Sequence, residues 1–177
     1  MTAIEMDKTF SIHAVLTDTG RANGKTHLLA QVDTIKNQTL IYQLSPDMID
    51  EDKDINDQLT ALFGRTPEYK IEILSDLIVK LTDRLGGIET ASGHIDGKQA
   101  LQSVYDGRFD EVIDAIGKTL ARKNLLLTVP GLLNALSDTY KTDLPLTEAI
   151  KTFISEIPEL NDWKIELKKI ENKKQIQ

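Results

Sequence analysis

The side chains best suited to bind zinc in this sequence are those of its three histidines. His13 and His27 fall on two segments that both have the composition of β-strands, so their imidazoles can meet if these strands are neighbours. His94 lies far from both along the chain. This spacing does not match a zinc motif. We therefore expect the histidines to have hydrogen-bond partners within a sheet and not to bind zinc.

An acid-rich loop imitates the first half of a calcium-binding loop. Asp50, Asp52 and Asp54 occupy alternate positions, as the first ligands of such a loop do. The sixth position, where that loop needs glycine, is Ile55, and the twelfth, which needs glutamate, is Ala61. We therefore interpret the segment as a solvated turn.

Residues 94–118, HIDGKQALQSVYDGRFDEVIDAIGK, predict two consecutive helices, of which the second is poor in cations. Asp96 and Gln99 have the spacing of a capping box, which starts the first helix at Gly97. Beyond Gly107, apolar residues recur at helical spacing. Carboxylates occupy four positions in this part of the chain, namely Asp106, Asp110, Glu111 and Asp114. A phosphate ligand would meet little positive charge there.

No local motif identifies a catalytic centre. The loop TDTGRANGK matches neither a Walker loop nor a dinucleotide-binding fingerprint, and there is no Ser/His/Asp elbow. The sequence has no cysteine, which excludes disulfide scaffolds, thiol catalysis and Cys-ligated metals. Any chemistry must therefore come from residues that are distant along the chain.

Length and composition fit one soluble globular domain spanning residues 1–177. The 21 basic and 28 acidic residues give a net charge of −7, which argues against a nucleic-acid partner because such binding needs cations. No apolar run reaches the ~18 residues of a membrane span, and the first ten residues do not form a signal peptide.

Hydrophobic periodicity predicts strands early and late in the chain, with helices between and after them. The expected strands are 9–16, 26–33, 39–44, 68–74 and 162–170, with 88–91 as a short edge strand. The expected helices are 56–63, 76–85 capped by Ser75, 97–105, 109–127, 130–140 and 145–157. This order is typical of a mixed α/β (α+β) domain, in which helices flank both faces of a central mixed sheet.

Several phrases, taken in order, resemble the LytR-CpsA-Psr domain of Gram-positive cell envelopes. The most specific are VKLTDRLGGIE at 79–89 and HIDGKQAL at 94–101, and LSDTYKTDLPL at 136–146 supports them. The resemblance covers about residues 10–170. It implies a central sheet flanked by helices, with a lipid tail in an apolar cleft.

The resemblance also implies a location and an activity. The family domain lies outside the cytoplasm behind a membrane anchor, which would be a segment absent from this chain. Active members move an anionic glycopolymer from a polyprenyl-diphosphate carrier onto peptidoglycan and use a divalent cation such as Mg²⁺. Arginine forks and carboxylates suit that chemistry because they bind phosphate oxygens and the metal.

The family's site motifs match this chain only in part. Asp18 matches a catalytic and metal-binding aspartate, and Arg21 stands for the turn arginine that follows it. Asp47 and Arg108 are the corresponding candidates for substrate binding. The paired arginines of the family fall near Tyr105 and Gly107, where this chain has none.

We therefore expect a degenerate member of the family that lacks phosphotransferase activity. Its expected role is a module that binds a polyprenyl lipid, a cell-wall glycopolymer or an active paralogue, with no cofactor. The alternative is an active phosphotransferase that uses Asp18, Arg21, Asp47 and Arg108 with Mg²⁺. Losing one preorganised donor typically costs ~10²–10³ in rate, so the loss of several favours the inactive reading.

Overall fold

The computed structural model describes residues 9–20, 24–145 and 164–176. Within these residues, eight strands form one six-stranded sheet and one small hairpin. The strands are β1 Thr9–Thr17, β2 Lys25–Asp33, β3 Gln38–Leu44, β4 Tyr69–Leu74, β5 Ile88–Thr90, β6 Gly93–Ile95, β7 Tyr140–Thr142 and β8 Lys164–Ile170.

The main sheet has the strand order β7-β4-β1-β2-β3-β8 and mixes both kinds of pairing. β4 lies parallel to β1 and β8 lies parallel to β3, whereas the other neighbours are antiparallel. In the antiparallel ladder Thr17 faces Lys25, and His27 faces Leu44. The end of β1, the start of β2 and the end of β3 therefore lie at the same edge of the sheet.

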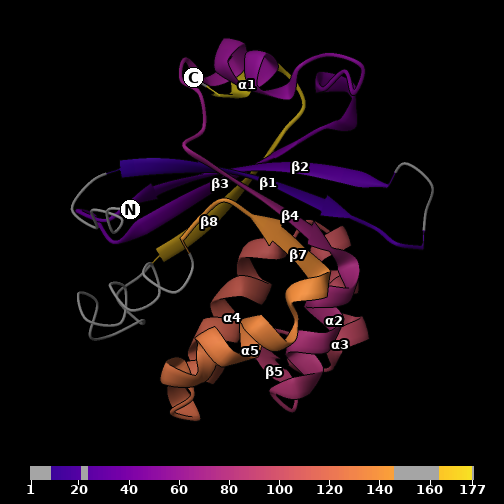
Figure 1. Ribbon diagram of the computed structural model, residues 1–177, viewed down its shortest axis with the longest axis vertical. Coiled ribbons are helices and arrows are strands. Elements are labelled where there is room, and N and C mark those ends of the chain that lie inside the picture. The colour runs from indigo at the N-terminus through magenta and orange to yellow at the C-terminus, as the bar shows by residue number, and fades with distance from the viewer. Residues whose placement is uncertain (1–8, 21–23, 146–163, 177) are drawn as a thin grey trace.

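Helices cover both faces of this sheet (Figure 1). The α-helices of the described residues are α1 Ile55–Phe63, α2 Ser75–Arg84, α3 Gly97–Tyr105, α4 Phe109–Arg122 and α5 Val129–Ala135. The described 3₁₀ turns are η1 Pro46–Met48, η2 Leu126–Thr128, η3 Ser137–Thr139 and η5 Lys173–Ile176. α1 lies on one side of the sheet and α2 to α5 lie on the other, which confirms the predicted fold class.

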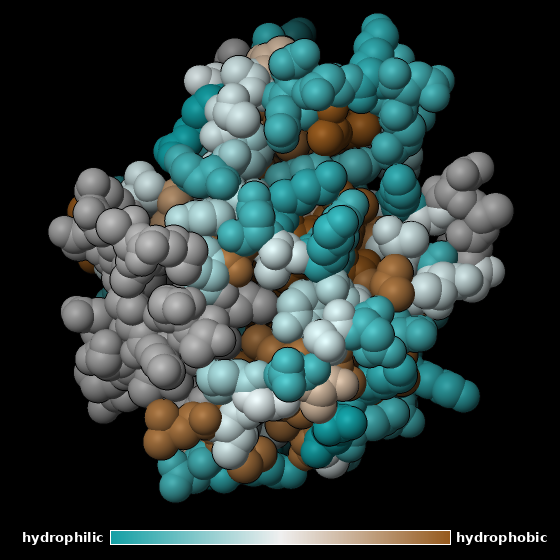
Figure 2. Space-filling view, viewed as in Figure 1, coloured by the Kyte–Doolittle hydropathy of each residue, from teal (hydrophilic) through white to brown (hydrophobic). Residues whose placement is uncertain are grey.

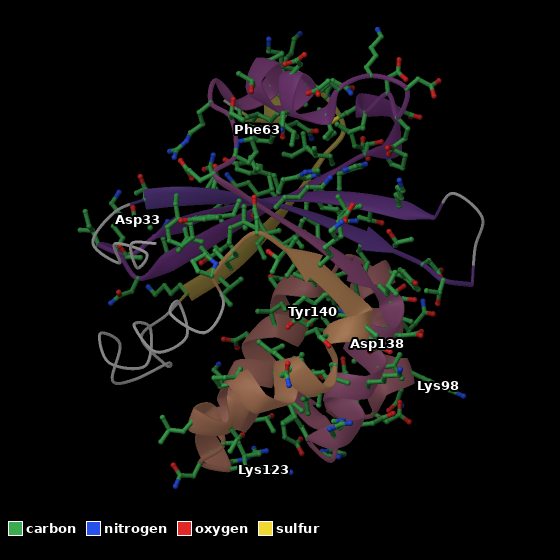
Figure 3. The ribbon with its side chains drawn as sticks, viewed as in Figure 1. Asp33, Phe63, Lys98, Lys123, Asp138 and Tyr140 are labelled. Atoms are coloured by element: carbon green, nitrogen blue, oxygen red, sulfur yellow. The ribbon has the colours of Figure 1, made fainter. Side chains whose placement is uncertain are left out.

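Each face of the sheet has its own core because successive strand residues point to opposite faces. Leu28 belongs to the larger core beside α2, α3 and α4, and its neighbour Leu29 belongs to the smaller core below α1. Tyr42 of β3 contacts Phe63 of α1, with the ring centroids 5.2 Å apart. Phe63 lies between α1 and the sheet (Figure 3). This contact joins α1 to the sheet.

Two helix boundaries follow the local sequence signals as predicted. Asp96 accepts a hydrogen bond from the Gln99 amide, and the Gln99 side chain accepts one from the Asp96 amide, so the capping box that starts α3 is complete. Gly86 and Gly87, with φ of 77° and 91°, end the α2 segment in the left-handed region that favours glycine.

Three expected elements were wrong for local reasons. The helix expected at 130–140 ends at Ala135, and residues 140–142 form strand β7 instead. Helix α4 ends at Arg122 rather than near Leu127, because Asn124 adopts φ 60° and the Leu125 amide donates back to the Leu120 carbonyl. Residues 88–90 pair with β6 in a separate hairpin and are not an edge strand of the main sheet. The expected last helix, 145–157, lies almost entirely outside the described residues.

Ser75 was expected to cap α2 and does not. It is the first residue of the helix, and no side-chain hydrogen bond caps that end. The Ser75 Oγ instead accepts a hydrogen bond from the Thr19 amide at 3.2 Å and lies 3.2 Å from the Thr19 Oγ1. The serine thus fixes the loop after β1 against the start of α2.

On the face that Figure 2 shows, polar residues predominate around α1, and apolar residues are exposed where the sheet meets the helices below it. Among the residues that the structure describes, no helix has the length and apolar character needed to span a bilayer.

Candidate functional site

A cavity of about 50 Å³ lies between the sheet and the junction of α3 with α4. Its position follows from strand alternation, because Leu16 and Leu28 point from the sheet toward the side that carries these helices. The lining residues come from three strands and the helix junction, namely Leu16, Thr26, Leu28, Gln43, Val104, Tyr105 and Phe109. The cavity is mainly apolar, with polar groups at its sheet side.

Asp18 lies two residues beyond Leu16, which lines this cavity. Its Oδ1 accepts a hydrogen bond from the Gly20 amide at 2.8 Å, which closes a tight turn after β1. The next residue, Thr19, is bound to Ser75 of α2. The first predicted catalytic residue therefore stabilises the turn that directly follows β1. Its predicted partner Arg21 lies outside the described residues.

Arg108 flanks the same cavity from the helix side, because the next residue, Phe109, lines it. Its guanidinium lies 3.3 Å from Asp106 and 3.7 Å from Glu111. Both pairs are half exposed, so each contributes little to stability in solvent. Arg108, the cation predicted to bind substrate, nevertheless has two carboxylates of its own chain segment within 4 Å.

Asp47 follows the end of β3, at the same edge of the sheet as the end of β1. It is exposed in η1, and the residues that follow it, Met48 and Ile49, pack into the core below α1. Arg108 lies on the opposite side of the sheet, next to the larger core. Leu16 and Phe109, close neighbours of Asp18 and Arg108 along the chain, thus line one cavity, whereas the residues after Asp47 pack on the other face.

The two sheet histidines do meet, as the sequence allowed. The Nε2 of His13 lies 3.0 Å from the Nδ1 of His27, and the His27 Nε2 lies 2.6 Å from the Glu51 carboxylate. Both imidazoles are buried, whereas the Glu51 side chain is about half exposed. Burial lowers the pKa of His13 to about 4, the nearby His27 and Lys70 add to this, and Glu51 opposes it.

The described residues do not gather a metal-binding cluster of three or more His, Cys, Asp or Glu side chains. In the acid-rich loop, Asp54 accepts from the Asp57 amide and caps α1, and Asp50 accepts from the Asp52 amide. These carboxylates are used by local turns, as the sequence reading proposed. Asp18 alone does not provide a ligand set for Mg²⁺.

Sequence reasoning did not identify Thr26 and Gln43, the polar residues on the sheet side of the cavity. The sequence did contain a signal for them. Leu28 is two residues after Thr26 and Ile41 is two residues before Gln43, so each polar residue shares a strand face with an apolar core residue. That signal could only be interpreted once the register of β2 and β3 was known.

Solved structures of several bacterial proteins share this fold. The Lin1025 protein from Listeria innocua is 21% identical with a TM-score of 0.69, and the match covers 93% of this chain and 83% of that one. B. subtilis TagV is 12% identical with a TM-score of 0.64, covering 93% and 85%. TagT, in a structure described as bound to LI-WTA, is 14% identical with a TM-score of 0.61, covering 96% and 82%.

These neighbours include LytR-CpsA-Psr proteins, so the resemblance seen in the sequence is confirmed at the level of the fold. No model of a known protein family matches the sequence, and no curated protein matches it either.

Proposed function

We propose that this chain is a cell-envelope domain of the LytR-CpsA-Psr type that binds a polyprenyl-linked ligand without transferring it. Three observations support the proposal together: the shared fold, the structure of TagT bound to LI-WTA, and a mainly apolar cavity lined by Leu16, two residues before Asp18. The proposed location is outside the cytoplasm. Membrane attachment would come from a segment beyond this chain.

The observation that carries the inactive reading is the environment of Arg108. Transfer of a diphosphate-linked group requires cations that are free to bind the phosphate oxygens as charge develops on them. Here the guanidinium lies within 4 Å of Asp106 and Glu111, which are part of the same helix junction. A phosphate would have to displace both carboxylates and then remain next to them.

The cavity also limits how a lipid can be held. Its volume of about 50 Å³ is well below the ~300–1,000 Å³ of an ordinary ligand pocket. A polyprenyl chain therefore enters only if Tyr105 and Phe109, at the α3–α4 junction, move away from the sheet. Because the lining is mainly apolar, the contacts with the chain would offset part of the cost of this opening.

Native mass spectrometry with undecaprenyl phosphate tests the binding proposal. We expect a one-to-one adduct with the wild-type chain and a loss of that adduct in Thr26→Phe, whose ring would fill the cavity from β2. Phenylalanine suits a strand position, so this variant should fold. Thr17→Phe is the matched control, because Thr17 follows the cavity-lining Leu16 and points to the opposite face.

Two results would contradict the binding proposal. One is the absence of an adduct with the wild-type chain, and the other is an equal loss of the adduct in both threonine variants. An active phosphotransferase that uses Asp18 with Mg²⁺ is the competing function. It makes a different prediction, namely turnover of a polyprenyl diphosphate, and that assay separates the two functions.

A further inference from the structure

One lysine of the last described strand reaches the rim of the cavity. Lys169 of β8 lies opposite Gln43 of β3, and Gln43 lines the cavity. Ile165 and Leu167, on the same face of β8, pack against the larger core. By strand alternation the Lys169 side chain points to the side of the sheet that carries α3 and α4.

The lysine crosses from the sheet to the helix junction. Its Nζ lies 3.4 Å from the main-chain carbonyl oxygen of Asp106, and its side chain passes over Gly107. A side chain at position 107 would overlap the end of Lys169, and the φ of +87° there favours glycine in any case. Gly107 therefore leaves the space in which the lysine lies, between the cavity-lining residues Tyr105 and Phe109 along the chain.

The charge of Lys169 is available to a ligand. Among the described residues, no carboxylate lies within 4.0 Å of its Nζ, and its recorded partner is a neutral carbonyl. Arg108, the other cation of this junction, is paired with Asp106 and Glu111. Arg108 is thus paired with two carboxylates. Lys169 can exchange its weak hydrogen bond to a carbonyl for a stronger, charge-assisted bond to an anion.

We propose that Lys169 binds the phosphate group of a polyprenyl phosphate whose chain enters the cavity. This inference rests on the proposed function, because it assigns the headgroup contact of the same lipid. The phosphate monoester lies outside the cavity, where the exposed ammonium can reach it. The chain end contacts the apolar lining, so charge and hydrophobic contact select an anionic lipid over its neutral alcohol.

Affinities for undecaprenyl phosphate and for undecaprenol, measured in the same detergent, test the inference. We expect the wild-type chain to prefer the phosphate roughly tenfold, as one partly exposed charge-assisted contact would give. Lys169→Gln should bind both lipids equally, and Lys169→Arg should retain the preference. Lys168→Gln is the matched control, because it removes the same charge from the same strand on the opposite face.

Each remaining outcome overturns a defined part of this account. A preference that persists in Lys169→Gln, or that falls equally in Lys168→Gln, would overturn the role of Lys169 while leaving lipid binding intact. Equal affinity of the wild-type chain for the two lipids would do the same. Competition by inorganic phosphate as effective as by the lipid would overturn the lipid assignment. Failure of both lipids to bind would overturn the proposed function and this inference with it.

Discussion

The Nε2 of His13 lies 3.0 Å from the Nδ1 of His27, across the antiparallel pair of β1 and β2. The His27 Nε2 lies 2.6 Å from Glu51, and a carboxylate can only accept, so this nitrogen carries the proton. With the His27 Nδ1 as acceptor, the Nε2–H of His13 donates to it, and the buried Nδ1 of His13 is then unprotonated. That Nδ1 has no hydrogen-bond partner among the described residues.

This arrangement predicts a loss of stability in acid. The pKa of His13 is lowered to about 4 in the folded chain, against an ordinary value of 6.5, so the unfolded chain binds the proton first. The contribution of His13 is fully present above pH 6.5 and is lost as the pH falls toward 4, by roughly 3 kcal/mol in total. Urea unfolding at pH 7.0, 5.5 and 4.5 measures it. Between pH 7.0 and 4.5 the free energy of unfolding should fall less in His13→Leu, by about the contribution of His13. If it fell equally with pH in both proteins, His13 would not be the group responsible.

Gly97 predicts a large cost for adding one methyl group. A Cβ at this position would meet the Val79 carbonyl of α2 and would lie 2.8 Å from Asp83, to which the Gly97 amide donates. We expect Gly97→Ala to lower the free energy of unfolding by ~1–3 kcal/mol. Gly131→Ala in α5 is the control, since nothing lies within 4 Å and alanine favours helix. Denaturant melts that ranked the two variants in the opposite order would contradict this view of α2–α3 packing.

Neutralising the acids around Arg108 should create an anion site. In the double variant Asp106→Asn and Glu111→Gln we expect pyrophosphate to bind about three- to tenfold more tightly by calorimetry, because the guanidinium is released. Adding Arg108→Gln should abolish the gain. The double variant Asp110→Asn and Asp114→Asn removes the same number of negative charges from α4 and leaves both partners of Arg108 in place. A gain of the same size there would mean that overall charge, and not Arg108, is responsible.

The main features of the sheet could be predicted from the sequence, and the reason is local. β1 to β3 are rich in strand-forming residues. The turn before β2 contains two glycines and the turn before β3 contains Asn37, so the strand bounds and pairing follow from short-range rules. The parallel contacts of β4 and β8 join segments that are far apart along the chain. The end of α4 depends on the left-handed Asn124, which periodicity does not reveal because apolar residues continue beyond it.

The candidate site was less accessible to the sequence. The neighbours of Arg108 could be predicted, because Asp106 and Glu111 lie within three residues of it. The contact of Lys169 could not, because it joins β8 to a carbonyl 63 residues earlier. The roles of Asp18, Arg21 and Asp47 stay predictions from the family resemblance. In the structure, Asp18 and Asp47 follow strands that end at the same sheet edge, and Met48 and Ile49 after Asp47 pack on the face opposite the cavity.

The most direct test of the account is the turnover of undecaprenyl diphosphate by the purified chain with Mg²⁺, at protein concentrations that saturate binding of the lipid. We predict that phosphate release and transfer stay at the rate of the protein-free control, and that Asp18→Ala changes nothing. Turnover that requires Mg²⁺ and falls sharply in Asp18→Ala would contradict the account and establish a working phosphotransferase.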